Sequence, residues 1–259
     1  MSAAQSAGID LGLRGKRALI TGGSRGVGRA TALLLARAGV DVVIGYRSRH
    51  DEANALVEEL ESLGVRASAV AADLADPEAA ERLFQAAIDA FGGLDIFVGN
   101  AGVWPPDTVP IARMGDAQWA STLDVNLTAI FRTVRLAARW VEEDGRIVLV
   151  SSTAGQRGEA FHADYAASKG GMISLAKGVA IELASRGITV NCVAPGWIDT
   201  EMAAQPFEEA RERIESEIPL GRVATAEDVA GPIVFLCSRL GRHITGEVVN
   251  VNGGSVLCG

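Results

Sequence analysis

Tyr165 and Lys169 are four residues apart, and side chains of these two types at this spacing could transfer a proton together. Residues four apart lie on one face of a helix, so the ammonium can approach the phenol. It would favour a tyrosinate and lower the pKa of the phenol from about 10, which allows proton exchange with an alcohol or carbonyl oxygen near neutral pH. Ser152, 13 residues before the tyrosine, could hydrogen-bond the same oxygen. Such a pair also occurs on ordinary solvated helix faces, so the rest of the chain decides between these interpretations.

Short apolar segments alternate with longer helical patterns along the chain. The segments expected to be strands are 17–21, 41–46, 67–72, 94–100, 146–151, 189–194 and 247–251. The segments expected to be helices are 26–38, 51–63, 77–91, 116–140, 164–186 and 225–239. Several strand segments are nearly continuous in Val, Ile and Leu, as in parallel strands buried on both faces. The alternation predicts a single-domain α/β fold of the Rossmann type, a three-layer sandwich with a seven-stranded parallel sheet and helices on both faces.

A glycine-rich turn joins the first expected strand to the first expected helix. Glycines allow a tight turn and let a pyrophosphate approach backbone N–H groups, and the helix N-terminus adds its positive dipole end. The strand–turn–helix context therefore predicts a dinucleotide site. The residues of this turn expected to bind the cofactor are Gly22, Ser24, Arg25, Gly26, Val27 and Gly28.

The end of the second expected strand carries Tyr46 and Arg47, where a site that prefers NAD carries an acidic residue for the ribose hydroxyls. The guanidinium groups of Arg47 and Arg25 suit a 2′-phosphate, which a carboxylate would repel. NADP(H) is therefore expected in preference to NAD(H). The alternative is that one or both arginines are solvated surface residues.

Two further strands are expected to end beside the cofactor, at the edge where open α/β sheets bind ligands. Asp73, followed by Leu74, is expected to accept a hydrogen bond from the adenine amino group, although an aspartate in this region could instead cap a helix. Asn100, followed by Ala101 and Gly102, closes the fourth strand. Asn100 could serve the cofactor or tie the strand ends together.

Jointly these residues resemble the short-chain dehydrogenase/reductase family over residues 13–255. The resemblance includes the glycine-rich turn, Asp73, Gly99-Asn100-Ala101-Gly102, Asn126, Ser152, Tyr165, Lys169, Pro195-Gly196 and Val251-Asn252-Gly253-Gly254. The chain departs from the family at Gly99, where an asparagine is usual. The resemblance implies an NAD(P)-dependent oxidoreductase that acts on CH–OH or C=O groups.

The family's residue roles carry over to matching positions. The resemblance implies that Tyr165 is the acid/base, that Lys169 lowers its pKa and binds the nicotinamide ribose, and that Ser152 orients the substrate oxygen. It implies that Asn126 holds a water in a proton relay leading to Lys169. The residues that would meet the nicotinamide end of the cofactor are Pro195, Gly196, Ile198 and Thr200.

Within the family the chain is most similar to bacterial 3-oxoacyl-[acyl-carrier-protein] reductases of fatty acid biosynthesis, which implies a 3-oxoacyl thioester substrate. Arg186 matches one basic residue that receives the acidic carrier, but Glu143 stands at the second such position and should repel it. Docking of an acyl carrier protein is therefore left open. A small alcohol, ketone, sugar or polyol is the alternative substrate, and a non-catalytic nucleotide-binding protein is the third hypothesis.

Residues 197–218 follow Pro195-Gly196 and interrupt the alternation of strands and helices. Their amphipathic sequence predicts a helical insertion, which could be a lid over a pocket or a charged surface excursion. Besides Ser152 and Tyr165, the residues expected to contact the substrate are Trp104, Gln156 and Trp197.

Composition restricts the class of protein and its partners. The 259 residues have a net charge of −8 and no basic stretch, which argues against nucleic acid. No run of 18 apolar residues predicts a membrane span, and three widely spaced cysteines suggest neither a disulfide framework nor a metal site. A cytoplasmic protein is expected, with a flexible tail at 1–12 before the domain at 13–259. The family resemblance implies a homotetramer.

Overall fold

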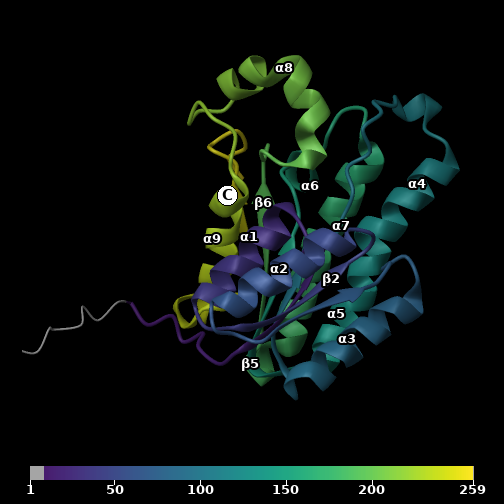
Figure 1. Cartoon of the computed structure of the whole chain (residues 1–259). Coiled ribbons are helices and arrows are strands. Elements are labelled where there is room, and N and C mark those ends of the chain that lie inside the picture. Colours follow the sequence, from purple (N-terminus) through teal and green to yellow (C-terminus); the bar gives the residue numbers. More distant parts are fainter. Residues whose placement is uncertain (1–8, 259) are drawn as a thin grey trace, which may run out of the picture.

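The computed structural model describes residues 9–258. It has a seven-stranded sheet that lies between two layers of helices (Figure 1). Every neighbouring pair of strands is parallel, in the order β3-β2-β1-β4-β5-β6-β7. The strands are β1 Arg17–Thr21, β2 Asp41–Tyr46, β3 Ala67–Ala71, β4 Leu94–Gly99, β5 Val141–Val150, β6 Thr189–Pro195 and β7 Val248–Val251. The predicted fold class is confirmed.

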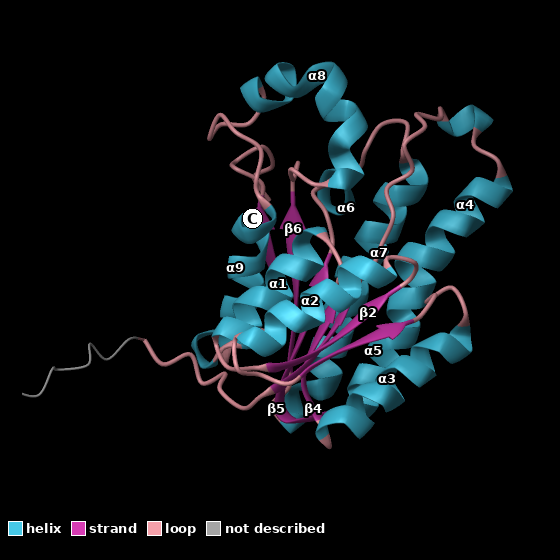
Figure 2. Ribbon diagram, in the orientation of Figure 1, coloured by secondary structure: helices cyan, strands magenta, loops and turns pink. Residues whose placement is uncertain are grey.

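Helices cover both faces of the sheet (Figure 2). They are α1 Gly26–Arg37, α2 His50–Ser62, α3 Pro77–Phe91, α4 Asp116–Leu123, α5 Ala129–Trp140, α6 Ala154–Arg157, α7 Ala163–Leu183, α8 Ala204–Ser216 and α9 Ala226–Cys237. The helices α1, α2 and α9 share one apolar cluster with the sheet, and α3, α5 and α7 share the other. Consecutive residues of a strand point to opposite faces, so Leu19 packs in one cluster and Ile20 in the other.

The strand order reverses between β1 and β4, which are neighbours in the sheet although β2 and β3 lie between them in sequence. The chain leaves β1 toward one side and β4 toward the other, so the connections diverge at their carboxyl ends. Open α/β sheets bind ligands in the crevice that this divergence creates. The glycine-rich turn after β1 and the loop after β4 therefore meet at one edge.

The predicted element boundaries hold closely, with differences around α4, α5 and β5. The helix expected at 116–140 is divided by a π-helical segment, Asp124–Thr128. β5 begins at Val141 instead of 146, because Val141 is fully buried and pairs with Leu94 before the register shifts. Three exposed acidic residues follow Val141 and hide this first pairing from a search for apolar runs. The short helix α6 was not expected.

The inserted segment after β6 forms a lobe that stands above the carboxyl ends of the strands (Figure 1). Its helix, α8, confirms the helical insertion that the sequence predicted within 197–218. The lobe has an apolar cluster of its own, formed by Ala203, Phe207, Ile214, Ile218 and Val223. Trp197 packs against this cluster and connects it to the sheet edge.

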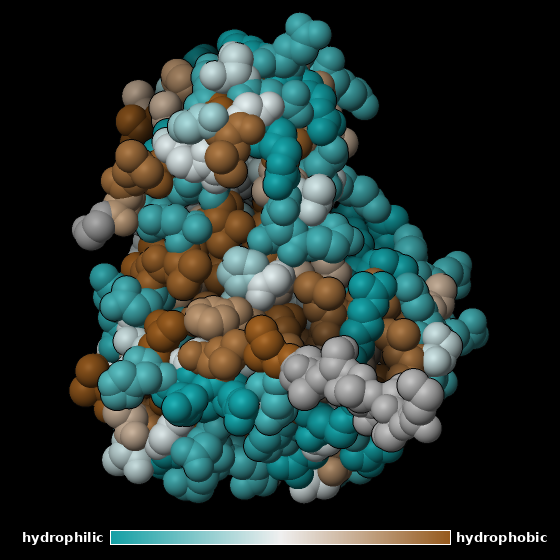
Figure 3. Space-filling model, turned by 90° about the vertical axis from the view of Figure 1, so that its left-hand side faces the viewer, coloured by the Kyte–Doolittle hydropathy of each residue, from teal (hydrophilic) through white to brown (hydrophobic). Residues whose placement is uncertain are grey.

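The two ends of the described part of the chain lie on the side of the molecule that carries α9 (Figure 1). Residues 1–8 of the expected flexible tail lie outside the described residues, whereas residues 9–12 are held by Arg239, whose backbone N–H and Nε donate to the carbonyls of Leu11 and Asp10. Apolar side chains gather across the middle of this face, below the α8 lobe (Figure 3). Within residues 9–258 no helix is long and apolar enough to cross a membrane.

Candidate active site

A cavity of about 760 Å³ lies at the carboxyl ends of the strands, between the sheet and the α8 lobe. It collects residues from the glycine-rich turn, the ends of β2, β4, β5 and β6, and helix α7. The predicted cofactor residues that line it are Gly22, Ser24, Arg25, Gly26, Val27, Tyr46, Arg47, Asp73, Leu74, Asn100, Ala101, Gly102, Tyr165, Lys169, Pro195, Gly196, Ile198 and Thr200. Of the predicted substrate contacts, Ser152, Trp104 and Trp197 line it as well.

Gly28 does not line the cavity but packs beneath the glycine-rich turn. A Cβ at this position would lie 2.3 Å from the carbonyl oxygen of Gly22 and 2.7 Å from Nδ2 of Asn100. Gly22 itself has a φ of +64°, a conformation that favours glycine. The turn can therefore fold tightly over α1, and the residues at the helix N-terminus line the cavity, which is the arrangement in which backbone N–H groups bind a pyrophosphate.

Asn100 ties the ends of β1 and β4 together. Its Nδ2 donates to the carbonyl oxygens of Thr21 and Gly22, at 2.9 and 3.0 Å, and its backbone N–H donates to Oγ1 of Thr21 at 3.0 Å. Of the two roles left open for Asn100, the structure gives this one directly. The helix cap left open for the region of Asp73 belongs instead to Asp76, which accepts from the backbone N–H of Glu78 at the start of α3.

Tyr165 is buried at the floor of the cavity, near the start of α7. Burial raises the pKa of its phenol to about 12, and the side-chain hydrogen bond with Ser152 acts in the opposite direction. That Lys169 lowers this pKa stays a prediction: its Nζ lies 5.8 Å from the ring centroid, and burial is the largest influence on the phenol. The phenol is therefore protonated at neutral pH and is ready to donate.

Lys169 is 5% exposed, and its Nζ donates to the carbonyl oxygen of Val150 at 2.9 Å. Burial lowers the pKa of its ammonium to about 8. Ser151 lies behind the pair, with its Oγ donating to the backbone carbonyl of Lys169 at 2.9 Å. Both serines line the cavity, but the Ser151 hydroxyl is used by that carbonyl, whereas Ser152 Oγ accepts from the backbone N–H of Ala154 at 3.1 Å and keeps its own proton for another partner. The geometry favours Ser152 over Ser151 as the serine that meets a substrate.

Asn126 is fully buried in the π-helical segment and does not line the cavity. Its side chain exchanges two hydrogen bonds of 2.8 Å with the backbone of Val103, in the loop after β4. A Cβ on Gly102 would lie 3.1 Å from Oδ1 of Asn126 and 3.4 Å from Nζ of Lys169. The asparagine therefore lies close to the lysine and holds the loop that forms this part of the cavity wall.

Aromatic side chains form the wall opposite the glycine-rich turn. Trp104 donates from Nε1 to Glu159 at 3.0 Å, stacks on His162 at 4.6 Å between centroids, and meets Trp197 edge-on at 6.2 Å. Gln156, predicted as a substrate contact, is not part of this wall, because its amide turns toward β7 and donates to Asn250 at 2.7 Å. Glu159 lines the cavity and was missed, since a single glutamate in a loop gives no periodic signal.

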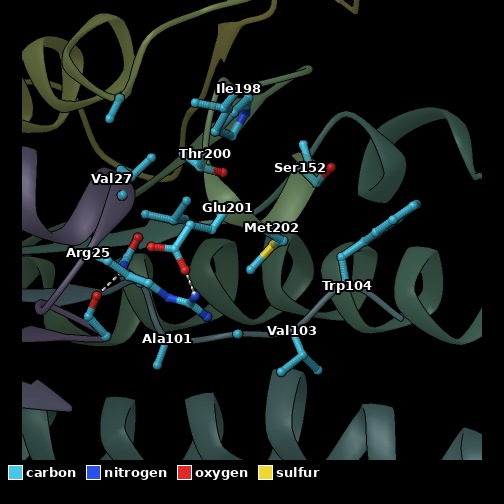
Figure 4. A pocket seen from close by; sticks show the side chains of 18 of the residues that line it. Arg25, Val27, Ala101, Val103, Trp104, Ser152, Ile198, Thr200, Glu201 and Met202 are labelled. Atoms are coloured by element: carbon cyan, nitrogen blue, oxygen red, sulfur yellow. Dashed lines mark hydrogen bonds and ion pairs between the residues drawn. The ribbon is translucent and has the colours of Figure 1, made fainter. Parts of the chain in front are cut away.

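A cluster of charges lies at the end of the cavity that receives the β2 end. Arg25, Arg47 and Arg49 all line it, as does Glu201 from the segment before α8. Glu201 Oε2 accepts from Arg25 at 2.5 Å and from Arg49 at 2.7 Å (Figure 4 shows Arg25 and Glu201). The sequence predicted Arg25 and Arg47 at this end of the cavity but not Glu201. Glu201 is about 150 residues or more from Arg25 and Arg49 in sequence, so no local pattern connects them.

Comparisons with known proteins agree with this geometry. The sequence model of a family described as enoyl-(acyl carrier protein) reductase matches residues 22–255. The 3-oxoacyl-[acyl-carrier-protein] reductase FabG of Staphylococcus aureus is 39% identical over 244 residues, which are 93% of this chain and 98% of that protein. A short-chain dehydrogenase of Burkholderia cenocepacia, solved in complex with NADP, is 40% identical with a TM-score of 0.88, over 94% of this chain and 98% of that one.

A further solved structure, a blue fluorescent protein from a metagenomic library in complex with NADPH, is 36% identical with a TM-score of 0.89, over 95% of this chain and 99% of that one. These similarities extend over nearly the whole chain and include every segment that lines the cavity. The structure agrees with these similarities in its fold, in its glycine-rich turn and in the grouping of Ser152, Tyr165 and Lys169 at one cavity. The chain belongs to the short-chain dehydrogenase/reductase family and is an NAD(P)-dependent oxidoreductase that acts on CH–OH and C=O groups.

Proposed function

We propose that this chain is an NADPH-dependent reductase of 3-oxoacyl thioesters. The observation that carries the proposal is the buried, protonated phenol of Tyr165 beside Ser152, on a cavity that also holds a glycine-rich turn. A proton donor and a second hydrogen-bond donor at one point suit a carbonyl oxygen that gains negative charge. The S. aureus relative is named for this reaction.

The chemistry divides between the cofactor and the chain. When bound, the nicotinamide supplies hydride to the carbonyl carbon. Tyr165 donates its proton to the carbonyl oxygen as charge develops there, and Ser152 Oγ orients that oxygen through a hydrogen bond. Lys169, with a pKa of about 8, remains mostly protonated at neutral pH, and its ammonium stabilises the tyrosinate left behind. Asn126 positions the loop beside Lys169 and is proposed to hold the water through which the proton returns.

The preference for the phosphorylated cofactor is supported by charge at the β2 end. Arg25, Arg47 and Arg49 line that end of the cavity, and guanidinium groups bind phosphate in paired hydrogen bonds. Two similar proteins were solved with NADP and NADPH. The residues present therefore fit NADP(H): a turn that admits a pyrophosphate and three cations for a 2′-phosphate.

The cavity wall favours an acyl chain over a polyol. Trp104, Trp197, Met202, Ile214 and Ile218 all line it, and these side chains offer few hydrogen bonds to a polyhydroxylated substrate. A small ketone is the second candidate, since the same wall also suits an apolar ketone. A 3-oxoacyl thioester agrees with both the wall and the named relative.

Recognition of the thioester is proposed to rest on the cavity and not on an acidic carrier. Arg186 is occupied within the chain: its NH1 donates to the carbonyl of Ala138 at 2.5 Å and its NH2 to that of Val141. Its Nε also faces Glu143 at 3.4 Å. A guanidinium held in this way beside a carboxylate offers little attraction to an acidic protein.

Cofactor oxidation at 340 nm tests the proposal, with NADPH and NADH measured against acetoacetyl-CoA, its N-acetylcysteamine analogue, simple ketones, diketones and ketoses. NADPH-dependent turnover of both thioesters is expected. A crotonoyl thioester is included because the matching family is described by enoyl reduction. Turnover of ketones or sugars alone would replace the thioester assignment with the small-carbonyl one. Reduction of the crotonoyl thioester alone would overturn carbonyl reduction.

A further inference from the structure

Glu201 occupies a position within the cofactor cleft that neither the general reaction nor the glycine-rich turn explains. Its carboxylate oxygen Oε2 accepts hydrogen bonds from Arg25 and Arg49 at once, at 2.5 and 2.7 Å. Arg25 belongs to the glycine-rich turn and Arg49 follows β2, so one oxygen joins the two sides of the proposed 2′-phosphate subsite. The carboxylate itself comes from a third place, the segment that leads into α8.

This segment lies directly over the glycine-rich turn. A Cβ on Gly26 would be 3.5 Å from Cγ2 of Thr200, the residue before Glu201. Glu201, Arg25 and Arg49 are each roughly half exposed, so the ion pairs lie at the mouth of the cleft and not in the core. The Glu201 carboxylate therefore connects the start of the α8 lobe to both sides of the cleft, through its ion pairs with Arg25 and Arg49.

An oxygen anion between two guanidinium groups is the chemistry that a phosphate monoester would also offer. A phosphate carries close to two negative charges at neutral pH and three acceptor oxygens, whereas the carboxylate carries one charge and two oxygens. Arg49 is in addition shared with Glu52 at 2.8 Å, which weakens its hold on Glu201. Its greater charge and its additional acceptor oxygen would let a phosphate compete with the carboxylate for both arginines.

We propose that Glu201 is an internal competitor of the cofactor's 2′-phosphate, and that a ligand bearing this phosphate displaces it and releases the start of the α8 lobe. The inference rests on the proposed preference for NADP(H). It assigns to Glu201 two effects: it lowers affinity for phosphorylated ligands specifically, and it couples occupation of the 2′-phosphate subsite to the mobility of residues 201–216.

The expected effect is modest because exposed ion pairs are weak. An exposed ion pair contributes at most about 1 kcal/mol, and dissolved salt screens it. Removal of the competing carboxylate is expected to tighten binding of a 2′-phosphorylated ligand about fivefold at low salt, which corresponds to about 1 kcal/mol. A ligand without the 2′-phosphate leaves Glu201 in place and gains nothing.

Calorimetric titration with 2′,5′-ADP and with 5′-AMP tests the competition, because the two nucleotides differ in the 2′-phosphate and neither carries a nicotinamide. Glu201→Gln is expected to bind 2′,5′-ADP about fivefold more tightly than the wild type and 5′-AMP equally well. Glu201→Asp keeps the charge but shortens the side chain, and is expected to resemble Glu201→Gln. Glu209→Gln removes a charge from the exposed face of α8, away from the cavity, and should change neither affinity.

The arginines separate failure of this inference from failure of the cofactor assignment. Arg25→Ala and Arg49→Ala should weaken 2′,5′-ADP and leave 5′-AMP unchanged. If they do so while Glu201→Gln binds 2′,5′-ADP like the wild type, the competitor role is wrong and the NADP(H) preference stands. If neither arginine variant distinguishes the two nucleotides, the proposed preference itself is wrong. If Glu209→Gln binds 2′,5′-ADP as tightly as Glu201→Gln does, the gain in affinity comes from the lower net negative charge alone, and the role proposed for Glu201 is wrong.

Hydrogen exchange tests the release. In the wild type, saturating 2′,5′-ADP is expected to speed exchange of backbone amides in 201–216 a few-fold, whereas saturating 5′-AMP should not. In Glu201→Gln the same amides should exchange at the faster rate without ligand and should not respond further. Slower or unchanged exchange in the wild type with 2′,5′-ADP would contradict the coupling between the subsite and the lobe.

Discussion

At the scale of single residues, burial moves Tyr165 and Lys169 toward their uncharged forms. The phenol pKa rises to about 12 and the ammonium pKa falls to about 8. Tyr165 therefore has a proton to give at neutral pH, and Lys169 loses its positive charge as the solution becomes mildly alkaline. Burial of the Lys169 ammonium lowers the stability of the fold at neutral pH, whereas the Tyr165 phenol is neutral there in both the folded and the unfolded chain and carries no such cost.

Tyr165→Phe is expected to lower turnover by two to four orders of magnitude, because proton donation is lost while the ring still fills the same space. NADPH binding should change little, since the substitution removes one oxygen and no charge at neutral pH. Steady-state rates at 340 nm and a fluorescence titration with NADPH measure the two effects separately. Turnover near that of the wild type would contradict the acid/base role.

Lys169→Met is expected to change how stability depends on pH. The lysine pKa is about 8 in the folded protein and 10.5 in the unfolded chain, so the unfolded chain binds the proton more tightly. Wild-type stability therefore falls as the pH drops from 10.5 to 8 and stays level below about 8, a loss of roughly 3 kcal/mol that the variant avoids.

Urea unfolding of both proteins across this pH range measures the difference between their free energies of unfolding. The difference should shift in favour of the variant as the pH falls toward 8. The variant also loses the hydrogen bond to Val150, which changes its stability by the same amount at every pH. The test is therefore how the difference in the free energy of unfolding changes with pH, and not its value at one pH. Parallel curves would show that burial of Lys169 carries no such penalty.

At the scale of elements, the packing between the glycine-rich turn and α1 controls the cofactor cleft. Gly28→Ala would place a Cβ 2.3 Å from the Gly22 carbonyl oxygen, so backbone must move. We expect at least tenfold weaker NADPH binding and a loss of stability of about 1–3 kcal/mol. Calorimetric titration and thermal unfolding measure both.

The matched control is Gly178→Ala in α7, where a Cβ would have no neighbour within 4 Å. Alanine is the better helix former, so this variant should gain about 0.5–1 kcal/mol and bind NADPH normally. Equal behaviour of the two variants would contradict the role assigned to Gly28.

Most elements and most cavity residues could be predicted from sequence because each has a local signal. Parallel strands buried on both faces give apolar runs, and the turn after β1 gives its glycines. Two kinds of feature gave no such signal. The orientation of Gln156 toward Asn250, and the contact of Glu201 with Arg25, depend on segments distant in sequence. The pKa of Tyr165 depends on burial by the whole fold, which no spacing reveals.

At the scale of the whole molecule, exposed apolar side chains on α4 and α5 support the expected homotetramer. Trp119, Phe131 and Trp140 are each more than a third exposed, so these tryptophans are not core residues of the single chain. Light scattering after size exclusion is expected to give a mass of four 27.0 kDa chains. Phe131→Glu should lower that mass, since a carboxylate in an apolar interface costs several kcal/mol. A wild-type monomer at micromolar concentration would contradict the assembly.

The π-helical segment Asp124–Thr128 has a consequence for the direction in which its neighbours face. A π turn closes over one more residue than an α turn, so the helix loses about 100° of phase as it passes through. A single helical wheel drawn over 116–140 therefore assigns the wrong face to half of its positions. The apolar faces of α4 and α5 must therefore be assigned separately for each helix. Asn126 lies in the segment between them, where its amide bonds the backbone of Val103.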